Sequence, residues 1–165
     1  MKIGIIADTH DRLPFIAKAV QKLNQEKVEL ILHAGDYSAP FVTSSFKPLK
    51  AKMIGVFGNN DAEKELLRRK FEEIGIEIRG KFAEIEVDGL KIALLHGEEA
   101  ELLKSLVTTD SYDAVIHGHT HQARIVKERK TLLINPGEVC GYLSEQATIA
   151  LLDTETMDVI VIPLE

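Results

Sequence analysis

The sequence has a single cysteine, Cys140, and no apolar run as long as a membrane-spanning helix. One cysteine cannot form an internal disulfide, which fits a reducing, cytoplasmic setting. A membrane span needs about 20 consecutive apolar residues, so no contact with a membrane is expected. Residues 1–3 lead directly into a strand pattern, without the charged and long apolar segments of a signal peptide. We therefore predict a cytoplasmic protein.

Basic residues are outnumbered by acidic ones, with 20 Lys and Arg against 26 Asp and Glu and a net charge of −6. Binding duplex nucleic acid through its backbone needs a basic face, so that partner is not expected. A small phosphorylated substrate remains compatible with this charge, because a metal ion can supply positive charge locally.

Features that separate domains are absent as well: there is no linker, no low-complexity stretch and no internal repeat. The chain of 165 residues is long enough for a substantial core, and 45% hydrophobic with 28% charged residues is ordinary for a globular protein. We predict one domain over residues 1–165.

Strands and helices alternate in the first half of the chain. Strands are predicted at 2–7, 29–34 and 51–57, and helices at 11–25, 40–46 and 61–74. Asp11 and Asp61 are predicted to be N-caps. This alternation predicts right-handed crossovers and a parallel sheet.

Hairpins dominate the second half. Antiparallel pairs are predicted at 81–87 with 90–95, 122–127 with 131–134, and 147–153 with 157–163, with a helix at 98–106 and a strand at 114–117. The Asp88-Gly89 turn is the strongest hairpin pattern among them. Together the two halves predict an α/β (α+β) fold in which two sheets pack face to face with helices outside.

Polar side chains follow each apolar run, at the place where open α/β sheets bind ligands. The set is Asp8, His10, Asp36, Asn59, Asn60, His96, His119 and His121. Ordinary turn chemistry accounts for Asp36, Asn59 and Asp61, but it has no use for the four histidines. We interpret the set as a metal site.

The types of ligand indicate the metal. Imidazole with carboxylate and amide oxygen, and without thiolate, suits Mn²⁺, Fe²⁺, Zn²⁺ or Ni²⁺. Without Asn60, the set contains seven candidate ligands, which exceed the three or four protein ligands of one catalytic ion, so two ions are expected. Two divalent ions, less the charges of Asp8, Asp36 and a bridging hydroxide, leave one positive charge, which a phosphodiester monoanion neutralises. This balance mildly favours a diester over a monoester.

Five short motifs follow one another along the chain. They are D-x-H beginning at Asp8, G-D at Gly35, G-N-x-D at Gly58, His-Gly at His96 and G-H-T-H at Gly118. In these motifs the chain resembles the calcineurin-like metallophosphoesterase superfamily, specifically its small single-domain phosphodiesterases. The resemblance covers essentially the whole chain. It implies a β-sandwich flanked by helices in a four-layer fold.

The resemblance also implies residue roles. One ion would be held by Asp8, His10, Asp36 and His121, and the other by Asp36, Asn59, His96 and His119. Asp36 would bridge both ions, and a bridging hydroxide would attack phosphorus. Asp36, Asn59, Asn60 and His96 would form the catalytic set, with Asp61 supporting its loop. The activity implied is that of a dinuclear-metal phosphodiesterase acting on small phosphodiesters. The alternatives are a phosphomonoesterase or nucleotidase on the same site, and a non-catalytic protein-interaction scaffold.

Asn60 departs from the family pattern, because many relatives have His there to bind phosphate or protonate the leaving oxygen. An amide donates a hydrogen bond but cannot act as a general acid, which predicts better hydrolysis of activated aryl esters than of alkyl esters.

Other residues allow two interpretations. His33 and His117 either orient ligands or are satisfied core histidines, and the Asn135-Pro136-Gly137 segment either closes the rim of the site or forms a plain turn. Cys140 is predicted to be a small buried apolar residue. Tyr37, Phe41 and Tyr142 are predicted to pack rather than to line a base or aryl pocket. The oligomeric state is open, a homodimer included.

Overall fold

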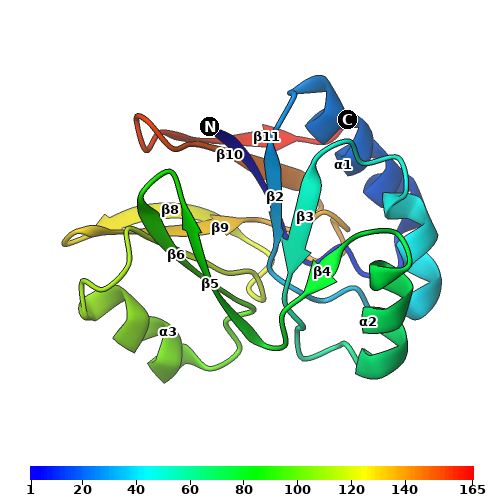
Figure 1. The fold of residues 1–165 in the computed structure, drawn as a ribbon, viewed down its shortest axis with the longest axis horizontal. Helices are drawn as coiled ribbons and strands as arrows, with labels where there is room; N and C mark the ends of the chain where they lie inside the picture. Colours follow the sequence, from blue (N-terminus) through cyan, green and yellow to red (C-terminus); the bar gives the residue numbers. More distant parts are fainter.

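The computed structural model describes residues 1–165 and has two β-sheets packed between two layers of helices (Figure 1). The first sheet has the strand order β11-β10-β1-β2-β3-β4 and the second β5-β6-β7-β9-β8. The first sheet comprises β1 (Lys2–Ile6), β2 (Leu30–His33), β3 (Lys52–Gly55), β4 (Glu77–Ile78), β10 (Thr148–Asp153) and β11 (Val159–Pro163). The second comprises β5 (Phe82–Val87), β6 (Leu90–Leu95), β7 (Ala114–Ile116), β8 (Ala123–Glu128) and β9 (Thr131–Pro136).

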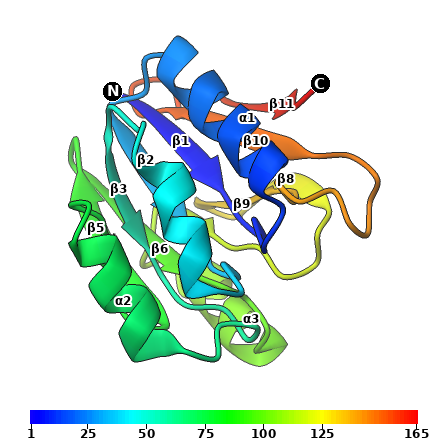
Figure 2. The same cartoon turned by 90° about the vertical axis from the view of Figure 1, so that its right-hand side faces the viewer.

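The helices lie outside the sheets. Figure 2 shows α1 (Leu13–Gln25) and α2 (Lys64–Glu72) in front of β1, β2 and β3, on the same side as the 3₁₀ helix η1 (Pro40–Phe46). The remaining helix, α3 (Ala100–Thr108), covers the outer face of the second sheet. The order of layers is therefore helix, sheet, sheet, helix, which confirms the predicted fold class.

The central strands of each sheet explain this layering, because their residues are apolar on both faces. In β1, Ile3 and Ile5 point toward the second sheet, whereas Ile6 points toward the outer helices. In β6, Ile92 and Leu94 lie between the sheets. Each sheet therefore needs a partner on both sides to remove its apolar surface from water.

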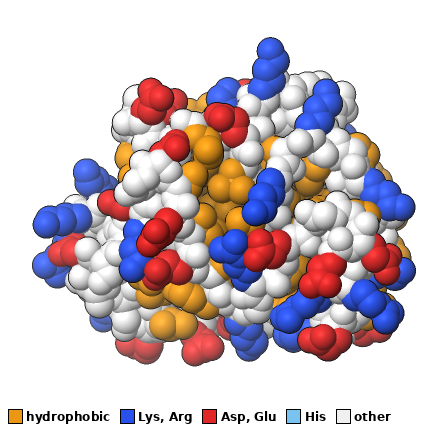
Figure 3. Space-filling view, in the orientation of Figure 1, with side chains coloured by type: hydrophobic (Ala, Val, Ile, Leu, Met, Phe, Trp, Pro, Cys, Tyr) orange, Lys and Arg blue, Asp and Glu red, His pale blue; other side chains and the backbone are white.

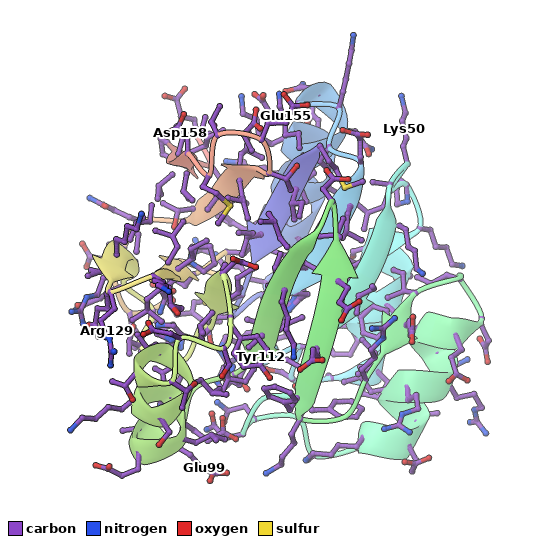
Figure 4. All side chains as sticks on the ribbon, turned by 60° about the vertical axis from the view of Figure 1, so that its left-hand side comes forward. Lys50, Glu99, Tyr112, Arg129, Glu155 and Asp158 are labelled. Carbon is purple, nitrogen blue, oxygen red and sulfur yellow. The ribbon has the colours of Figure 1, made fainter.

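Many charged side chains lie on the surface of the molecule. Figure 4 shows Lys50, Glu99, Arg129, Glu155 and Asp158 pointing away from the layers. None of the helices is long and apolar enough to cross a membrane.

The parallel pairings of β1, β2, β3 and β4 agree with the predicted crossovers, and the three predicted hairpins form. The second half also contains parallel pairings, β6 with β7 and β7 with β9, so it is less dominated by hairpins than predicted. The short strand β4 was not expected. It has only two residues, too few for a periodic pattern.

Both predicted N-caps are wrong. Helix α1 begins at Leu13 after Arg12, with no side-chain cap, and Asp11 accepts a hydrogen bond from the Tyr142 hydroxyl at 3.0 Å instead. Helix α2 begins only at Lys64. Asp61 instead accepts backbone N–H groups from the loop after β2 and from Gly58 in its own loop, and these donors occupy both of its carboxylate oxygens.

Candidate metal centre

The predicted ligands lie on loops that follow β1, β2, β3, β6 and β7, and backbone hydrogen bonds tie several of these loops together. The Asp8 N–H donates to the Gly35 carbonyl at 3.0 Å, and the Gly118 N–H donates to the His96 carbonyl at 3.0 Å. The bond from Asp8 joins two loops of the first sheet. The bond from Gly118 joins two loops of the second sheet. The N–H of His119 then donates to Asp8 Oδ2 at 3.0 Å and links the two sheets.

Five of the predicted ligands have left-handed backbone conformations, which are uncommon for residues other than glycine. The φ angles are 49° at Asp8, 42° at His10, 64° at Asp36, 69° at His119 and 60° at His121. Each costs conformational energy that the surrounding structure must offset, and such residues concentrate at functional sites. The loops are therefore shaped to aim these side chains inward.

Two motif glycines are required by close approach. A Cβ at Gly58 would lie 2.0 Å from Asp36 Oδ1, and a Cβ at Gly118 would lie 2.7 Å from Asp8 Oδ2. Any side chain at either position would collide with a carboxylate of the site. This explains why glycine precedes the ligands in the G-N-x-D and G-H-T-H motifs.

Four side chains form a compact first group: Asp8, His10, Asp36 and His121. One ligand atom of each lies within 4.8 Å of the others. His10 Nε2 is 3.6 Å from Asp36 Oδ2, and His121 Nε2 is 3.4 Å from Asp8 Oδ1. This group has the residue types and separations of a site for one divalent ion.

A second group adjoins the first through Asp36. His96 Nε2 lies 3.3 Å from Asp36 Oδ2, and the rings of His96 and His119 are 5.2 Å apart at their centroids. His119 Nδ1 lies 3.1 Å from Asn59 Oδ1. All seven sequence-predicted ligands therefore meet in two adjoining groups, with Asp36 in contact with both.

Burial and charge shape the protonation of this cluster. Burial raises the pKa of Asp8 to about 6, although nearby histidines oppose the shift. For His96, burial disfavours the charged imidazole, but the carboxylates of Asp36 and Asp8 outweigh it and raise its pKa to about 9. For Asp36, His96 and the Asn60 hydrogen bonds outweigh burial and hold its pKa far below the usual range. The cluster therefore favours a positive charge between its two carboxylates.

Three buried polar atoms in the centre lack any hydrogen-bond partner: Asp8 Oδ1, His10 Nε2 and His96 Nε2. Buried polar groups in folded proteins are nearly always satisfied, so several orphaned atoms in one cluster need an explanation. Bound cations would satisfy all three. The donor set therefore fits divalent metal ions.

The far side of several imidazoles is anchored to the protein. His96 Nδ1 lies 2.8 Å from the Ala34 carbonyl, which can only accept, so Nδ1 keeps its proton and Nε2 is the nitrogen that would bind a metal in place of its own proton. His10 Nδ1 pairs with Ser38 Oγ at 2.8 Å. His121 Nδ1 pairs with a carboxylate oxygen of Glu138. Such outer partners orient metal-ligating histidines and fix their tautomers.

Asn60 is directed at Asp36 instead of open space. Its backbone N–H donates to Asp36 Oδ1 at 2.9 Å and its side-chain amide to Oδ2 at 2.8 Å. Both oxygens of the predicted bridging carboxylate are thus oriented by one residue. The resemblance to the family implied a catalytic role for position 60, and the contact with Asp36 is a second role.

The two remaining histidines, His33 and His117, form hydrogen bonds with backbone groups of the ligand loops. His33 Nδ1 accepts the Gly35 N–H at 3.0 Å, so its Nε2 carries the proton and donates to Thr9 Oγ1 at 3.0 Å. Burial lowers its pKa to about 3, which keeps it neutral. His117 Nδ1 lies 3.0 Å from the Gly118 carbonyl. Both are hydrogen-bonded core histidines that support ligand loops without contacting ligand side chains.

Asn135 is more than a turn residue. Its amide donates to the Gly118 carbonyl at 2.9 Å and to Thr120 Oγ1 at 3.0 Å, which braces the G-H-T-H loop. Among the aromatic residues, Tyr37 is fully buried and packs as predicted, whereas Tyr142 is 52% exposed with its ring 6.3 Å from that of His10. Phe41 is also exposed. Cys140 is buried, as predicted.

Glu138 was missed by sequence reasoning. It is fully buried, and hydrogen bonds from Cys140, His121 and Ser144 outweigh its burial and lower its pKa to about 2. The only signal in the sequence is its place directly after the Asn135-Pro136-Gly137 segment. No spacing rule connects positions 121 and 138, because their contact depends on how β9 runs beside β7.

Known proteins resemble this chain in sequence and in structure. The sequence model of a protein family, described as the calcineurin-like phosphoesterase superfamily domain, matches residues 1–157. A phosphodiesterase of Methanocaldococcus jannaschii is 43% identical and covers 100% of both chains. A probable metallophosphoesterase of Methanothermobacter thermautotrophicus is 34% identical over 96% of this chain and 90% of its own. The solved structure of an archaeal phosphodiesterase has a TM-score of 0.95 at 42% identity and covers 99% of this chain and 100% of that one.

Proposed function

The chain belongs to the calcineurin-like phosphoesterase superfamily, and we propose that it is a metal-dependent phosphodiesterase that hydrolyses small phosphodiesters. The observation that carries this proposal is the buried cluster of carboxylates and imidazoles with three unpartnered atoms facing its centre. The full-length identity of 43% to a phosphodiesterase supports the choice of a diester.

We assign Asp8, His10, Asp36 and His121 to one ion, and Asp36, Asn59, His96 and His119 to the other. The short distances from Asp36 Oδ2 to His10 and His96 support its assignment as the shared ligand. Two divalent ions held there would act as Lewis acids toward the phosphoryl oxygens and would lower the pKa of a bound water. Asn60 and Asp61 keep Asp36 in place through hydrogen bonds to its side chain and backbone.

For the metals we propose Mn²⁺ first, with Ni²⁺, Fe²⁺ and Zn²⁺ as the other ions that this mixed nitrogen and oxygen ligand set suits. We propose a cytoplasmic location, one domain over 1–165, and a small substrate in place of duplex nucleic acid. The net charge of −6 supports the last point. Figure 3 shows acidic and basic side chains interspersed over the face that it draws. A homodimer stays open.

The decisive experiment removes all metal and then adds Mn²⁺, Ni²⁺, Zn²⁺ or Mg²⁺ against aryl phosphodiesters and monoesters. Metal-dependent turnover of diesters above monoesters supports the proposal. A reversed preference would support the phosphomonoesterase, and no turnover with any ion would support the protein-interaction scaffold.

Asp36→Asn tests the assignment of the shared ligand. It should weaken both ions together and remove most of the turnover, because one carboxylate contacts both groups. Ion binding measured by titration should fall at both sites. Loss of a single ion from this variant would show that Asp36 belongs to one site only.

A further inference from the structure

Glu138 lies at the junction between a predicted metal ligand and a surface loop. One of its oxygens, Oε2, pairs with His121 Nδ1 and accepts from Cys140 Sγ at 3.0 Å. The other, Oε1, accepts the N–H groups of Leu143 at 2.9 Å and Ser144, and the Ser144 hydroxyl at 2.7 Å. A single buried carboxylate thus accepts five hydrogen bonds, two at the oxygen beside His121 and three at the oxygen beside the surface loop.

A buried, ionised carboxylate is expensive to keep unless it is well satisfied. The side chain of Glu138 is 0% exposed, in a place where an apolar residue of similar volume would avoid the desolvation cost. Within the 141–146 loop, the Ser144 hydroxyl also pairs with the backbone of Gln146, independently of Glu138. The contact to His121 is what specifically requires an acceptor on the side facing the metal centre.

We propose that Glu138 is a positioning residue for His121, which it holds with the proton on Nδ1 and the bare Nε2 toward Asp8. His121 Nε2 lies 3.4 Å from Asp8 Oδ1, on the side of the ring opposite Glu138. The inference rests on the proposed metal site. The side chain of Glu138 makes no hydrogen bond to Asp8, His10 or Asp36, the other predicted ligands of that ion.

The chain offers a variant that separates this role from a structural one. Glu138→Gln keeps the size of the side chain but provides one acceptor oxygen in place of two. If the amide oxygen stays with the loop donors, an NH₂ group faces His121 and cannot accept its proton. Ser144→Ala is the matched control, because it removes a loop donor to Oε1 and leaves the contact between Oε2 and His121.

The test measures Mn²⁺ binding to metal-free protein by titration. Glu138→Gln should weaken the ion at the His121 site by about 10–100-fold, as expected for loss of an outer partner of a ligating histidine. Ser144→Ala should bind both ions as the unmodified protein does. Equal affinity in Glu138→Gln and the unmodified protein, or an equal loss in both variants, would overturn the proposal. Failure of the unmodified protein to bind any ion would contradict the metal site itself.

A second measurement is independent of metal and of the folding of any variant. The ¹⁵N shifts of the His121 imidazole in the unmodified, metal-free protein at alkaline pH report which nitrogen carries the proton. The proposal requires an Nδ1–H tautomer. An Nε2–H tautomer would overturn it even if the variants cannot be prepared.

Discussion

Asp61 Oδ2 accepts the backbone N–H of Asp36 at 3.0 Å, across 25 residues of sequence. The same carboxylate accepts the N–H groups of Tyr37 and Ser38 at 2.7 and 2.9 Å and that of Gly58 at 2.7 Å. Asp36 needs this support because its φ of 64° is an uncommon conformation for a residue with a side chain. One side chain after β3 therefore shapes the loop after β2.

Asp61→Asn should destabilise the protein and loosen the site. An amide in the same place turns an NH₂ group toward backbone donors and leaves buried N–H groups unpaired, which costs about 2–4 kcal/mol. Urea unfolding of the metal-free protein measures the change. Asp158→Asn is the control, since Asp158 is exposed and should change the free energy of unfolding by less than about 0.5 kcal/mol. Similar values for both variants would contradict the role given to Asp61.

Asn60→His should raise the rate for alkyl phosphodiesters relative to aryl ones. An imidazole can protonate a poor leaving group, which an amide cannot do. The absolute rate for aryl esters should fall, because the amide hydrogen bond to Asp36 Oδ2 is lost. The measured quantity is the ratio of kcat/KM values for the two ester classes. Asn60→Ala, which loses the amide without adding an acid, should lower both rates and leave the ratio unchanged.

His33 should make the free energy of unfolding depend on pH. Burial lowers the pKa of His33 from 6.5 to about 3, so below pH 6.5 the unfolded chain takes up a proton that the folded chain does not. Stability is therefore lost as the pH falls from 6.5 toward 3, by up to about 1.4 kcal/mol per pH unit from this group. Urea unfolding at several pH values should show a shallower decline for His33→Gln. Parallel curves would show that His33 is not held neutral in the folded protein.

Cys140 should resist thiol reagents while the protein is folded. Burial, with the neighbouring Glu138 carboxylate, raises the pKa of the thiol well above its usual range, so almost no thiolate exists at pH 8. The thiol also donates to Glu138 Oε2 at 3.0 Å. A chromogenic disulfide reagent should react slowly in buffer and rapidly in denaturing urea. Rapid reaction of the folded protein would indicate that the 141–146 loop opens readily.

Much of the fold could be predicted because the strands carry their own pattern. The apolar character of β1 on both faces, and the Asp88-Gly89 turn between β5 and β6, are local features. The starts of α1 and α2 could not be predicted, since Asp11 and Asp61 have the chemistry of N-caps and are used elsewhere. Their partners come from loops distant in the chain, which a local pattern cannot reveal.

The sequence by itself determined which residue types stand at the strand ends, and hence a chemistry of carboxylates and imidazoles suited to divalent ions. Parallel strands bring their ends to the same edge, so the approximate meeting of Asp8, Asp36 and His96 follows from the pattern. Only the tertiary structure decided how the side chains are aimed. The pairing of His121 with Glu138, and of Asn60 with Asp36, depends on loop conformations fixed by contacts across the two sheets.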